Sequence, residues 1–244
     1  MAYCMLDMVR LGLTADIHAP KYLPFLRASI QRLKNIDLIL LAGDLVYKNA
    51  YDQLPEIVKV VRAVSRAPII ACFGNEEWEG YEDKYKEVGE ITWLNDESLT
   101  LDIGGFSVHL IGSRGILDRP TFWQRTHIKD IHRRYEVRFS KINRMLREVK
   151  GDVIVITHYA PTYTTLEGES ENAWPEMGCK RLESIIRETN PLLWIHGHAH
   201  KSTKLETWIG FTHILNVSLP ARREIVVLDL EDVKSERLKR AWSL

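Results

Sequence analysis

The first third of the chain alternates between short apolar runs and amphipathic segments. Residues 38–42 form a continuous apolar run, which is typical of a strand buried on both faces. Residues 22–34 instead carry Leu26, Ile30 and Leu33 at helical spacing. A β-α-β-α-β order of this kind indicates parallel strands joined by crossover helices. The expected elements are strands over residues 9–15, 38–42 and 68–73, with helices over residues 22–34 and 54–65.

The rest of the chain adds antiparallel strands to this beginning. Gly104 and Gly105 separate two short strand-like runs, which predicts a hairpin. We interpret residues 1–244 as a single α/β domain. The further expected elements are strands over residues 91–94, 99–103, 106–111, 153–157 and 192–195, helices over 130–149 and 179–189, a polar loop over 161–178, and two or three strands within 205–230.

Composition describes an ordinary globular chain with an uneven distribution of charge. The sequence has 244 residues, of which 45% are hydrophobic, and its 33 basic and 33 acidic side chains cancel. A strong nucleic-acid-binding signal is therefore missing. Acidic residues concentrate in 76–102 and basic residues in 114–150. We expect these two stretches to pair with each other as solvated surfaces, and the alternative is that the basic stretch attracts an anionic substrate.

Cysteine use and hydropathy favour a reducing compartment. Cys4, Cys72 and Cys179 are odd in number and far apart, so they do not form a disulfide framework. Cys72 lies in an apolar run and is expected in the core. The N-terminus lacks the apolar stretch of a signal peptide, and no apolar run approaches the roughly 20 residues of a membrane span. We expect a cytoplasmic location and no membrane partner.

Polar residues of metal-binding types follow five of the predicted strands. Each segment is common by itself and has an ordinary structural explanation, such as a turn. In open α/β sheets, however, binding sites form outside the carboxyl ends of the strands, so five such ends are expected to converge on one crevice. The segments are Asp16-Ile17-His18, Gly43-Asp44, Gly74-Asn75, His158 and His196-Gly197-His198-Ala199-His200.

These residue types suit the hydrolysis of phosphate esters. Two divalent cations roughly 3.5–4 Å apart acidify water and neutralise phosphate oxygens. Carboxylate, imidazole and amide ligands suit Mn, Fe, Zn, Co or Ni, and we favour Mn. Glycines beside Asp44, Asn75 and His198 let the backbone approach the ions closely.

The ordered set of segments, from Asp16 to His200, resembles the calcineurin-like metallophosphoesterase superfamily. The resemblance implies a four-layer α-β-β-α sandwich of two mixed β-sheets flanked by helices. It also implies that Asp44 bridges two metal ions. His196 is not a usual ligand, and we expect it either to support the site from behind or to be structural. The implied ligands are Asp16, His18 and His200 for the first ion, and Asn75, His158 and His198 for the second.

One position departs from the family pattern. Many members carry Gly-Asn-His followed by an acid, whereas this chain has Gly74-Asn75-Glu76-Glu77. Glu77 matches the acid that usually supports the site. Glu76 replaces a histidine that assists the leaving group, and three roles are open for it: a general acid, a contact to a metal or its water, or a solvated side chain without a role. Some members without this histidine favour phosphodiesters. The catalytic candidates are Asp44, Asn75, Glu76 and His198.

Substrate contacts are expected from the loop that leaves His158. Tyr163 and Trp174 of this loop are candidates for stacking on a base or ring, and the alternative is that both pack the loop onto the body. Asn75 is a further candidate for binding substrate. Among the remaining histidines, His109 and His213 are expected to be structural. His127 and His132 are expected at the surface, and the alternative is that one of them reaches the phosphate.

We therefore expect a metal-dependent phosphoesterase in which a hydroxide bound at a binuclear metal centre attacks phosphorus, with phosphodiesters preferred over monoesters. The expected substrate is a small phosphoester, nucleotides included, and a homo-oligomer is left open. The alternative is a catalytically weak or inactive scaffold of the same fold that binds protein or nucleic acid. The complete set of ligand types favours the enzyme.

Overall fold

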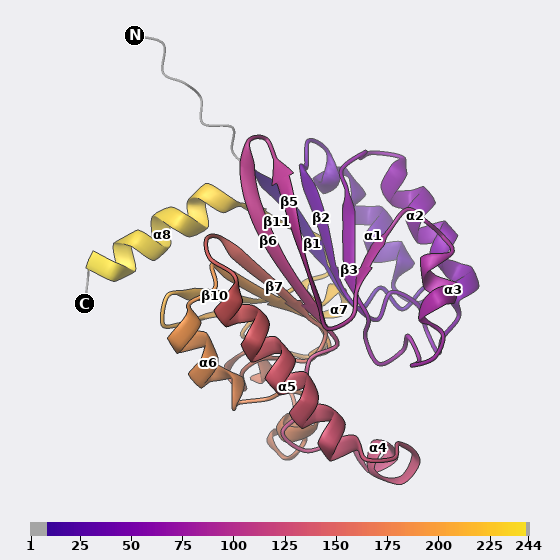
Figure 1. The fold of residues 1–244 in the computed structure, drawn as a ribbon. Helices are drawn as coiled ribbons and strands as arrows, with labels where there is room; N and C mark the ends of the chain where they lie inside the picture. Colours follow the sequence, from indigo (N-terminus) through magenta and orange to yellow (C-terminus); the bar gives the residue numbers. More distant parts are fainter. Residues whose placement is uncertain (1–8, 243–244) are drawn as a thin grey trace.

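A computed structural model describes residues 9–242 of the chain, so the expectations about Cys4 and the N-terminal segment lie outside the described residues. Two β-sheets form the centre of the molecule (Figure 1). The first sheet has the order β11-β1-β2-β3-β4, and only β11 runs antiparallel to its neighbour. Its strands are β1 (Arg10–Thr14), β2 (Leu38–Ala42), β3 (Ile69–Cys72), β4 (Thr92–Leu94) and β11 (Val226–Asp229).

The second sheet has the order β5-β6-β7-β8-β10-β9 and is also mixed. Its central strands are parallel, and the antiparallel pairs β5–β6 and β9–β10 close its two edges. Its strands are β5 (Glu97–Ile103), β6 (Phe106–Ser113), β7 (Val153–Thr157), β8 (Leu193–His196), β9 (Glu206–Ile209) and β10 (Thr212–Asn216).

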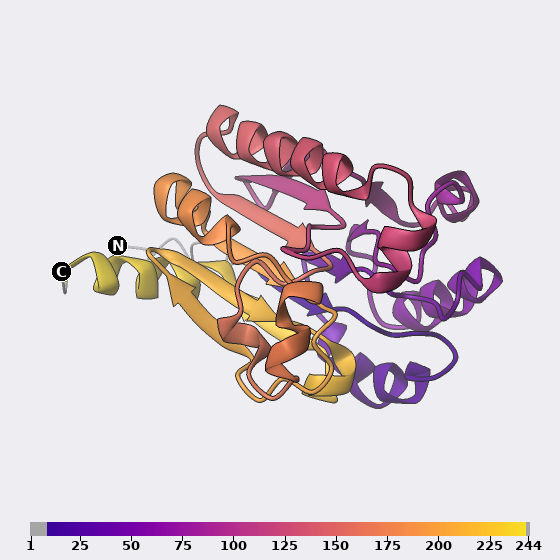
Figure 2. The same ribbon diagram turned by 90° about the horizontal axis from the view of Figure 1, so that it is seen from below.

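Helices cover the outer face of each sheet, as Figures 1 and 2 show. The first sheet is covered by α1 (Leu23–Ser29), which continues as a 3-10 turn (Ile30–Leu33), and by α2 (Leu54–Arg62) and α3 (Glu82–Lys86). The second sheet is covered by α5 (Ile131–Glu148) and α6 (Leu182–Thr189). The shorter or peripheral helices are α4 (Phe122–His127), α7 (Leu219–Arg222) and α8 (Leu230–Trp242), and 3-10 turns occur at Tyr51–Gln53, Thr164–Leu166 and Glu171–Glu176.

The apolar run of strand β2 is continuous because both of its faces are buried. Leu38 and Leu40 point into the layer between the two sheets, whereas Ile39 and Leu41 point under the helices. Each such side chain stabilises the fold by about 1.5–3 kcal/mol through burial. The predicted four-layer α-β-β-α sandwich of two mixed sheets is confirmed.

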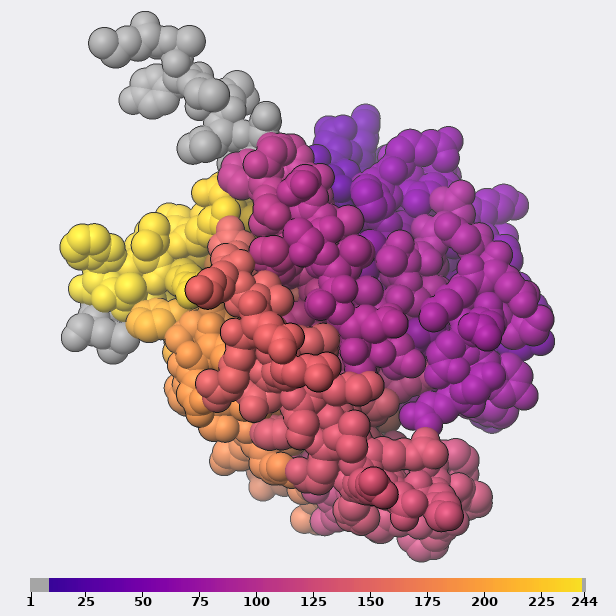
Figure 3. Space-filling view, viewed as in Figure 1, coloured from indigo at the N-terminus to yellow at the C-terminus, as the bar shows by residue number. Residues whose placement is uncertain are grey.

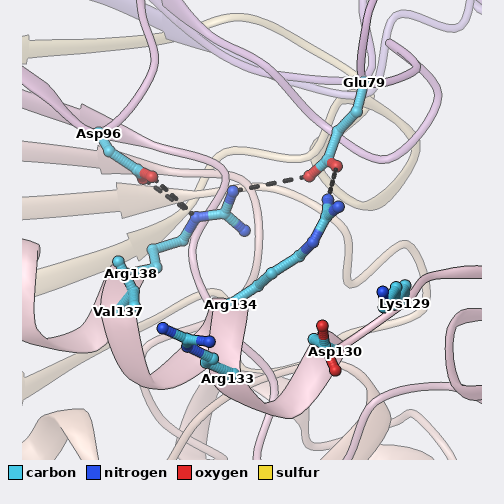
Figure 4. Close-up of a pocket in the computed structure, with 8 residues that line it drawn as sticks. All are labelled: Glu79, Asp96, Lys129, Asp130, Arg133, Arg134, Val137 and Arg138. Atoms are coloured by element: carbon cyan, nitrogen blue, oxygen red, sulfur yellow. Dashed lines mark hydrogen bonds and ion pairs between the residues drawn. The ribbon is translucent and has the colours of Figure 1, made fainter.

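The acidic and basic stretches pair with each other, as predicted. Arg134 and Arg138 of α5 both reach Glu79, with closest N–O distances of 2.7 and 3.7 Å, and Arg138 also contacts Asp96 at 3.0 Å. Figure 4 shows these pairs at the wall of a cleft of about 480 Å³. They tie α5 to the segment that follows Asn75.

Several elements differ from the prediction. Helices α4 and α8 were not expected, and the loop over residues 161–178 contains two 3-10 turns. Helix α8 projects from the body in Figure 1, and the region around α4 forms a lobe at the lower edge of Figure 3. Within residues 9–242, none of the helices combines the length and the apolar character required to cross a bilayer.

Candidate metal centre

The carboxyl ends of five strands converge where the two sheets meet. In the first sheet, β1 leads into Asp16 and His18, β2 leads into Asp44, and β3 leads into Asn75. β7 and β8 of the second sheet lead into the three remaining histidines. The structure thus brings together all seven predicted ligands, which are Asp16, His18, Asp44, Asn75, His158, His198 and His200.

The first group consists of Asp16, His18 and His200. His200 Nε2 lies 3.2 Å from Asp16 Oδ1 and 3.3 Å from His18 Nε2. His18 Nε2 lies 3.8 Å from the same Asp16 oxygen. One potential ligand atom from each residue therefore faces a common point, with all separations within 4.8 Å.

The second group consists of Asp44, His158 and His198, with Asn75 beside it. His158 Nε2 lies 3.3 Å from Asp44 Oδ2, 3.1 Å from His198 Nδ1 and 3.0 Å from Asn75 Oδ1. Asp44 Oδ2 also lies 3.7 Å from His18 Nε2 of the first group. The Asp44 carboxylate therefore stands between the two groups.

The hydrogen-bonding capacity of these residues fits cations. His158 Nδ1 lies 3.0 Å from the carbonyl oxygen of Ala42, which can only accept, so Nδ1 carries a proton. In a neutral imidazole Nε2 is then a lone pair that faces the Asp44 and Asn75 oxygens. Asp16 Oδ1 is buried and faces the Nε2 atoms of His200 and His18, at 3.2 and 3.8 Å. Converging acceptors of this kind are the donor set that divalent ions require.

Electrostatics within the site lead to the same conclusion. Burial lowers the pKa of His158, but the carboxylates of Asp44 and Asp16 outweigh burial and raise that pKa to about 9. Burial, reinforced by His158, lowers the pKa of His198 to about 3. Without a cation, the two buried carboxylates favour protonated imidazole beside them, since they raise the pKa of His158 and also that of His200. Divalent ions would stabilise the same carboxylates and leave the imidazoles neutral and able to ligate.

Strained backbone holds the ligands in place. Asp16, His18, Asp44 and His198 all adopt positive φ, between 41° and 67°. Such conformations cost roughly 1–3 kcal/mol each and persist where surrounding structure enforces them. Gly74 lets the two turns approach each other closely, because a Cβ there would lie 2.1 Å from Asp44 Oδ1. The approach of the glycine backbone to the ions stays a prediction.

Glu77 supports this backbone from behind. Its fully buried carboxylate accepts hydrogen bonds from the backbone N–H groups of Gly74 (2.6 Å), Asp44 (2.8 Å), Leu45 (2.7 Å) and Val46 (3.3 Å). Burial, reinforced by the Asp44 carboxylate, raises the pKa of Glu77 to about 7. This side chain therefore fixes two ligand-bearing turns relative to each other.

Arg114 also supports the site, and sequence reasoning missed it. Its buried guanidinium donates to the carbonyl oxygens of Gly74 and Glu77 and pairs with Glu82 at 3.2 Å. Arg114 directly follows β6, just as the ligands directly follow their strands. That position was the signal that could have identified it.

Glu76 makes contacts that none of the three expected roles describes. Its carboxylate accepts a hydrogen bond from Lys48 N at 2.6 Å, and its own N–H donates to Asp44 Oδ1 at 2.8 Å. The side chain is half-buried. Glu76 thus connects the turn after β3 to the turn after β2.

Tyr163 and Trp174 have partners inside the protein. Tyr163 donates to Asp118 Oδ2 at 2.8 Å, and the Trp174 indole N–H donates to the Glu169 carbonyl at 3.2 Å. The two rings pack at 5.9 Å beside a small apolar cluster. These contacts agree with the alternative that both residues pack the loop onto the body of the protein. Their role in substrate binding stays a prediction.

The histidines outside the seven have structural partners or lie at the surface. His196 is buried and lies 2.8 Å from Thr165 Oγ1. His109 pairs with Thr100 at 2.8 Å, and His213 stacks on a tryptophan with ring centres 4.5 Å apart. His127 and His132 are exposed on α4 and α5.

Comparisons with known proteins point to one family. A family model described as calcineurin-like phosphoesterase matches residues 9–202. A comparison with curated protein sequences found no match. Among solved structures, phosphopantetheinyl hydrolase from Mycobacterium tuberculosis is similar, with 13% identity, a TM-score of 0.60, and coverage of 89% of this chain and 92% of that one.

Two further structures have similar folds. The protein TT1561 of Thermus thermophilus is 14% identical, with a TM-score of 0.57 and coverage of 91% of this chain and 99% of that one. Purple acid phosphatase PPD1 from yellow lupin is 17% identical, with a TM-score of 0.53 and coverage of 80% of this chain and 38% of that one. At these identities the likeness supports the fold alone.

Proposed function

The chain belongs to the calcineurin-like phosphoesterase family, and from that premise we propose that it hydrolyses phosphodiesters with two divalent metal ions held between its sheets. The observation that carries the proposal is the pair of ligand groups, Asp16–His18–His200 and Asp44–His158–His198, with Asn75 beside the second. Asp44 Oδ2 lies 3.3 Å from a nitrogen of one group and 3.7 Å from a nitrogen of the other, as expected of a bridging carboxylate.

The two ions, when bound, supply an acidified water and neutralise the phosphate oxygens. The protein's own residues hold the metal ligands in position. Strained turns at Asp16, Asp44 and His198 aim the ligands. The Glu77 carboxylate holds the Asp44 turn to the turn that carries Asn75. Asn75 is exposed at the surface of the site, where its amide can contact a substrate oxygen as well as an ion.

Two features favour diesters and manganese. Position 76 holds a glutamate in place of the usual histidine proton donor. Its carboxylate accepts a hydrogen bond from Lys48 N in the turn after β2. A diester with a good leaving group depends least on such a donor. The mixed set of imidazoles, carboxylates and an amide oxygen suits a hard-to-borderline ion such as Mn²⁺.

We further propose that the whole chain acts as one metallophosphoesterase domain. The family match ends at residue 202, but β9 and β10 extend the second sheet and β11 joins the first. The proposed substrate is a small phosphoester such as a nucleotide derivative. The proposed location is the cytoplasm, because Cys72 and Cys179 are free, buried thiols.

The test combines metal analysis with two esters. The purified protein is stripped of metal, reloaded with Mn²⁺, and assayed on bis(p-nitrophenyl) phosphate and p-nitrophenyl phosphate. We expect two ions per chain, activity that requires metal, and faster cleavage of the diester. Asp16→Asn and His158→Ala should each lose an ion and orders of magnitude in rate, whereas Asp232→Asn and His132→Ala should not. Full metal-dependent activity in both site variants would overturn the proposal.

A further inference from the structure

Two neighbouring turns carry ligands at one end and extend to the surface at the other. One runs from Asp16 to residue 22 and the other from Asp44 to residue 49. Backbone hydrogen bonds join them: His18 N donates to Asp44 O at 2.9 Å, and Ala19 N donates to Leu45 O at 2.9 Å. The two turns therefore leave the metal centre side by side.

Near its surface end, each turn carries a tyrosine with a lysine next to it in the sequence. Lys21 Nζ lies 4.8 Å from the centre of the Tyr22 ring, and Lys48 Nζ lies 5.1 Å from the centre of the Tyr47 ring. Both rings meet the candidate ligand His18 edge-on, with ring centres 5.9 and 6.3 Å away. We call these four residues, Lys21, Tyr22, Tyr47 and Lys48, the tyrosine–lysine rim.

The two lysine ammonium groups of the rim are not paired with carboxylates among the described residues. Both lysines are exposed, and within residues 9–242 neither ammonium lies within 4.0 Å of a carboxylate oxygen. Other surface lysines do have such partners, for example Lys84 with Glu87 at 2.9 Å. Tyr47 is 42% exposed, so part of one aromatic residue beside the centre is open to a ligand.

Lys48 is held in its place by the residue that departs from the family pattern. Lys48 and Asn49 have positive φ of 46° and 59°, a conformation that needs support from surrounding contacts. The Glu76 carboxylate accepts from Lys48 N at 2.6 Å, and the Glu76 carbonyl accepts from Asn49 N at 2.9 Å. Asn49 Oδ1 in turn accepts from Trp78 N at 3.1 Å. The turn that presents Lys48 is therefore fastened to the turn that presents Asn75.

We propose that the tyrosine–lysine rim is a specificity subsite, in which the exposed Tyr47 contacts a planar ring and the lysines bind a second phosphate. Tyr22 supports the rim, since it is stacked on Phe25 with ring centres 6.0 Å apart. The substrate class is then a nucleotide-type phosphodiester that bears an additional phosphate group. Glu76 is a positioning residue, because it acts through Lys48 and not on the reacting phosphorus. This inference rests on the proposed function and specifies its substrate.

The physical basis is complementarity of shape and charge. Aromatic side chains stack with any nucleobase, and an ammonium attracts a phosphate as a point charge. Both lysines are exposed, so water and salt weaken each contact. The expected gain for a second phosphate is therefore about three- to tenfold in kcat/KM, and it should shrink as ionic strength rises.

The test compares two chromogenic diesters with the same reacting group. They are the p-nitrophenyl ester of thymidine 5′-phosphate and the same compound with a 3′-phosphate added. Both release p-nitrophenolate, so a difference in kcat/KM reports recognition of the added phosphate. We expect the Mn²⁺-loaded protein to prefer the 3′-phosphorylated ester about three- to tenfold. Lys48→Met and Lys21→Met should each reduce this preference, whereas Lys239→Met on α8 should leave it unchanged.

Glu76 requires a separate pair of variants. Glu76→Gln keeps an oxygen that can accept from Lys48 N, so the preference for the added phosphate should persist. Glu76→Ala removes that acceptor, so the preference should fall toward that of Lys48→Met. A general-acid role predicts a different pattern, in which both variants lose kcat equally and neither changes the preference.

The outcomes separate the subsite from the enzyme. Mn²⁺-dependent cleavage of bis(p-nitrophenyl) phosphate without any preference for the added phosphate would overturn the subsite and leave the proposed function in place. A preference that survives in Lys21→Met and Lys48→Met combined would also overturn the subsite. Failure of the metal-loaded protein to cleave any of the esters would overturn the proposed function itself.

Discussion

Replacing Glu77 with glutamine tests how the candidate site is held together. The Glu77 carboxylate lies between two ligand-bearing turns and accepts four backbone N–H bonds, two at each oxygen. Glutamine has almost the same shape but presents an NH2 group on one side. That group must face either the N–H groups of Gly74 and Asp44 or those of Leu45 and Val46. Either orientation replaces two hydrogen bonds with donor–donor contacts.

The expected loss of stability follows from those two bonds. Hydrogen bonds to charged groups contribute about 1.5–3 kcal/mol each. Burial, together with Asp44, raises the pKa of Glu77 to about 7, so the group is only partly ionised at neutral pH and the lower end of the range applies. We expect a loss of about 3 kcal/mol in the free energy of unfolding. For a chain of this length that corresponds to a fall in Tm of roughly 6–12 °C.

The assay is calorimetric unfolding of metal-free protein, so that ions do not mask the effect. Glu79→Gln is the matched control, because it removes the same charge two residues away. Glu79 pairs with Arg134 and Arg138 at the surface, and we expect its loss to cost about 1 kcal/mol or less. Metal retention by Glu77→Gln should fall as well. A Tm for Glu77→Gln no lower than that of Glu79→Gln would refute the argument.

Three further changes have clear expected results. Gly74→Ala places a Cβ 2.1 Å from Asp44 Oδ1, so metal retention should fall sharply in elemental analysis; unchanged retention would contradict the tight contact. Asp118→Ala removes an acceptor that anchors the loop over residues 161–178, so hydrogen exchange there should accelerate while the sheets stay protected. Burial, together with Asp118, raises the pKa of the Cys179 thiol. That thiol should therefore resist alkylation at pH 8.5 in the folded protein and react once unfolded. Its contribution to stability should be present below about pH 8.5, the pKa of a free thiol, and should be lost as the pH rises above it.

The strand ends explain why so much of the site was visible in the sequence. Strand β2 had to be apolar at every position because both of its faces are buried, and the first polar residue after it, Asp44, had to lie at the sheet edge. The same logic placed Asp16, Asn75 and His158. A run of buried residues followed by a ligand type is a local pattern, so one sequence suffices to find it.

Contacts between distant turns could not be predicted in this way. The bond from Lys48 N to Glu76 joins residues 28 apart, and only the packing of β2 beside β3 brings them together. Likewise, β11 pairs with β1 across more than two hundred residues, and nothing in its short apolar run specifies that partner. These features depend on tertiary structure alone.

Helix α4 was missed although a local signal was present. Thr121 and Gln124 form a capping box, with hydrogen bonds of 3.2 and 2.9 Å between them, and this spacing can be recognised in a sequence. The exposed Phe122 and Trp123 obscured it, because they interrupt the expected amphipathic pattern. For α8, only Leu230 and Val233 are buried, so its apolar stripe is too short to stand out.

The sharing of the Asp44 carboxylate by two ions can be measured most directly with manganese itself. Metal-free protein is titrated with Mn²⁺ while bound metal is counted and its electron paramagnetic resonance spectrum is recorded. We expect two ions per chain with a spin-coupled spectrum, since bridged ions lie roughly 3.5–4 Å apart. We also expect Asp44→Asn to weaken or abolish the coupling. A single bound ion, or two ions with uncoupled spectra in the wild-type protein, would contradict a shared Asp44 carboxylate.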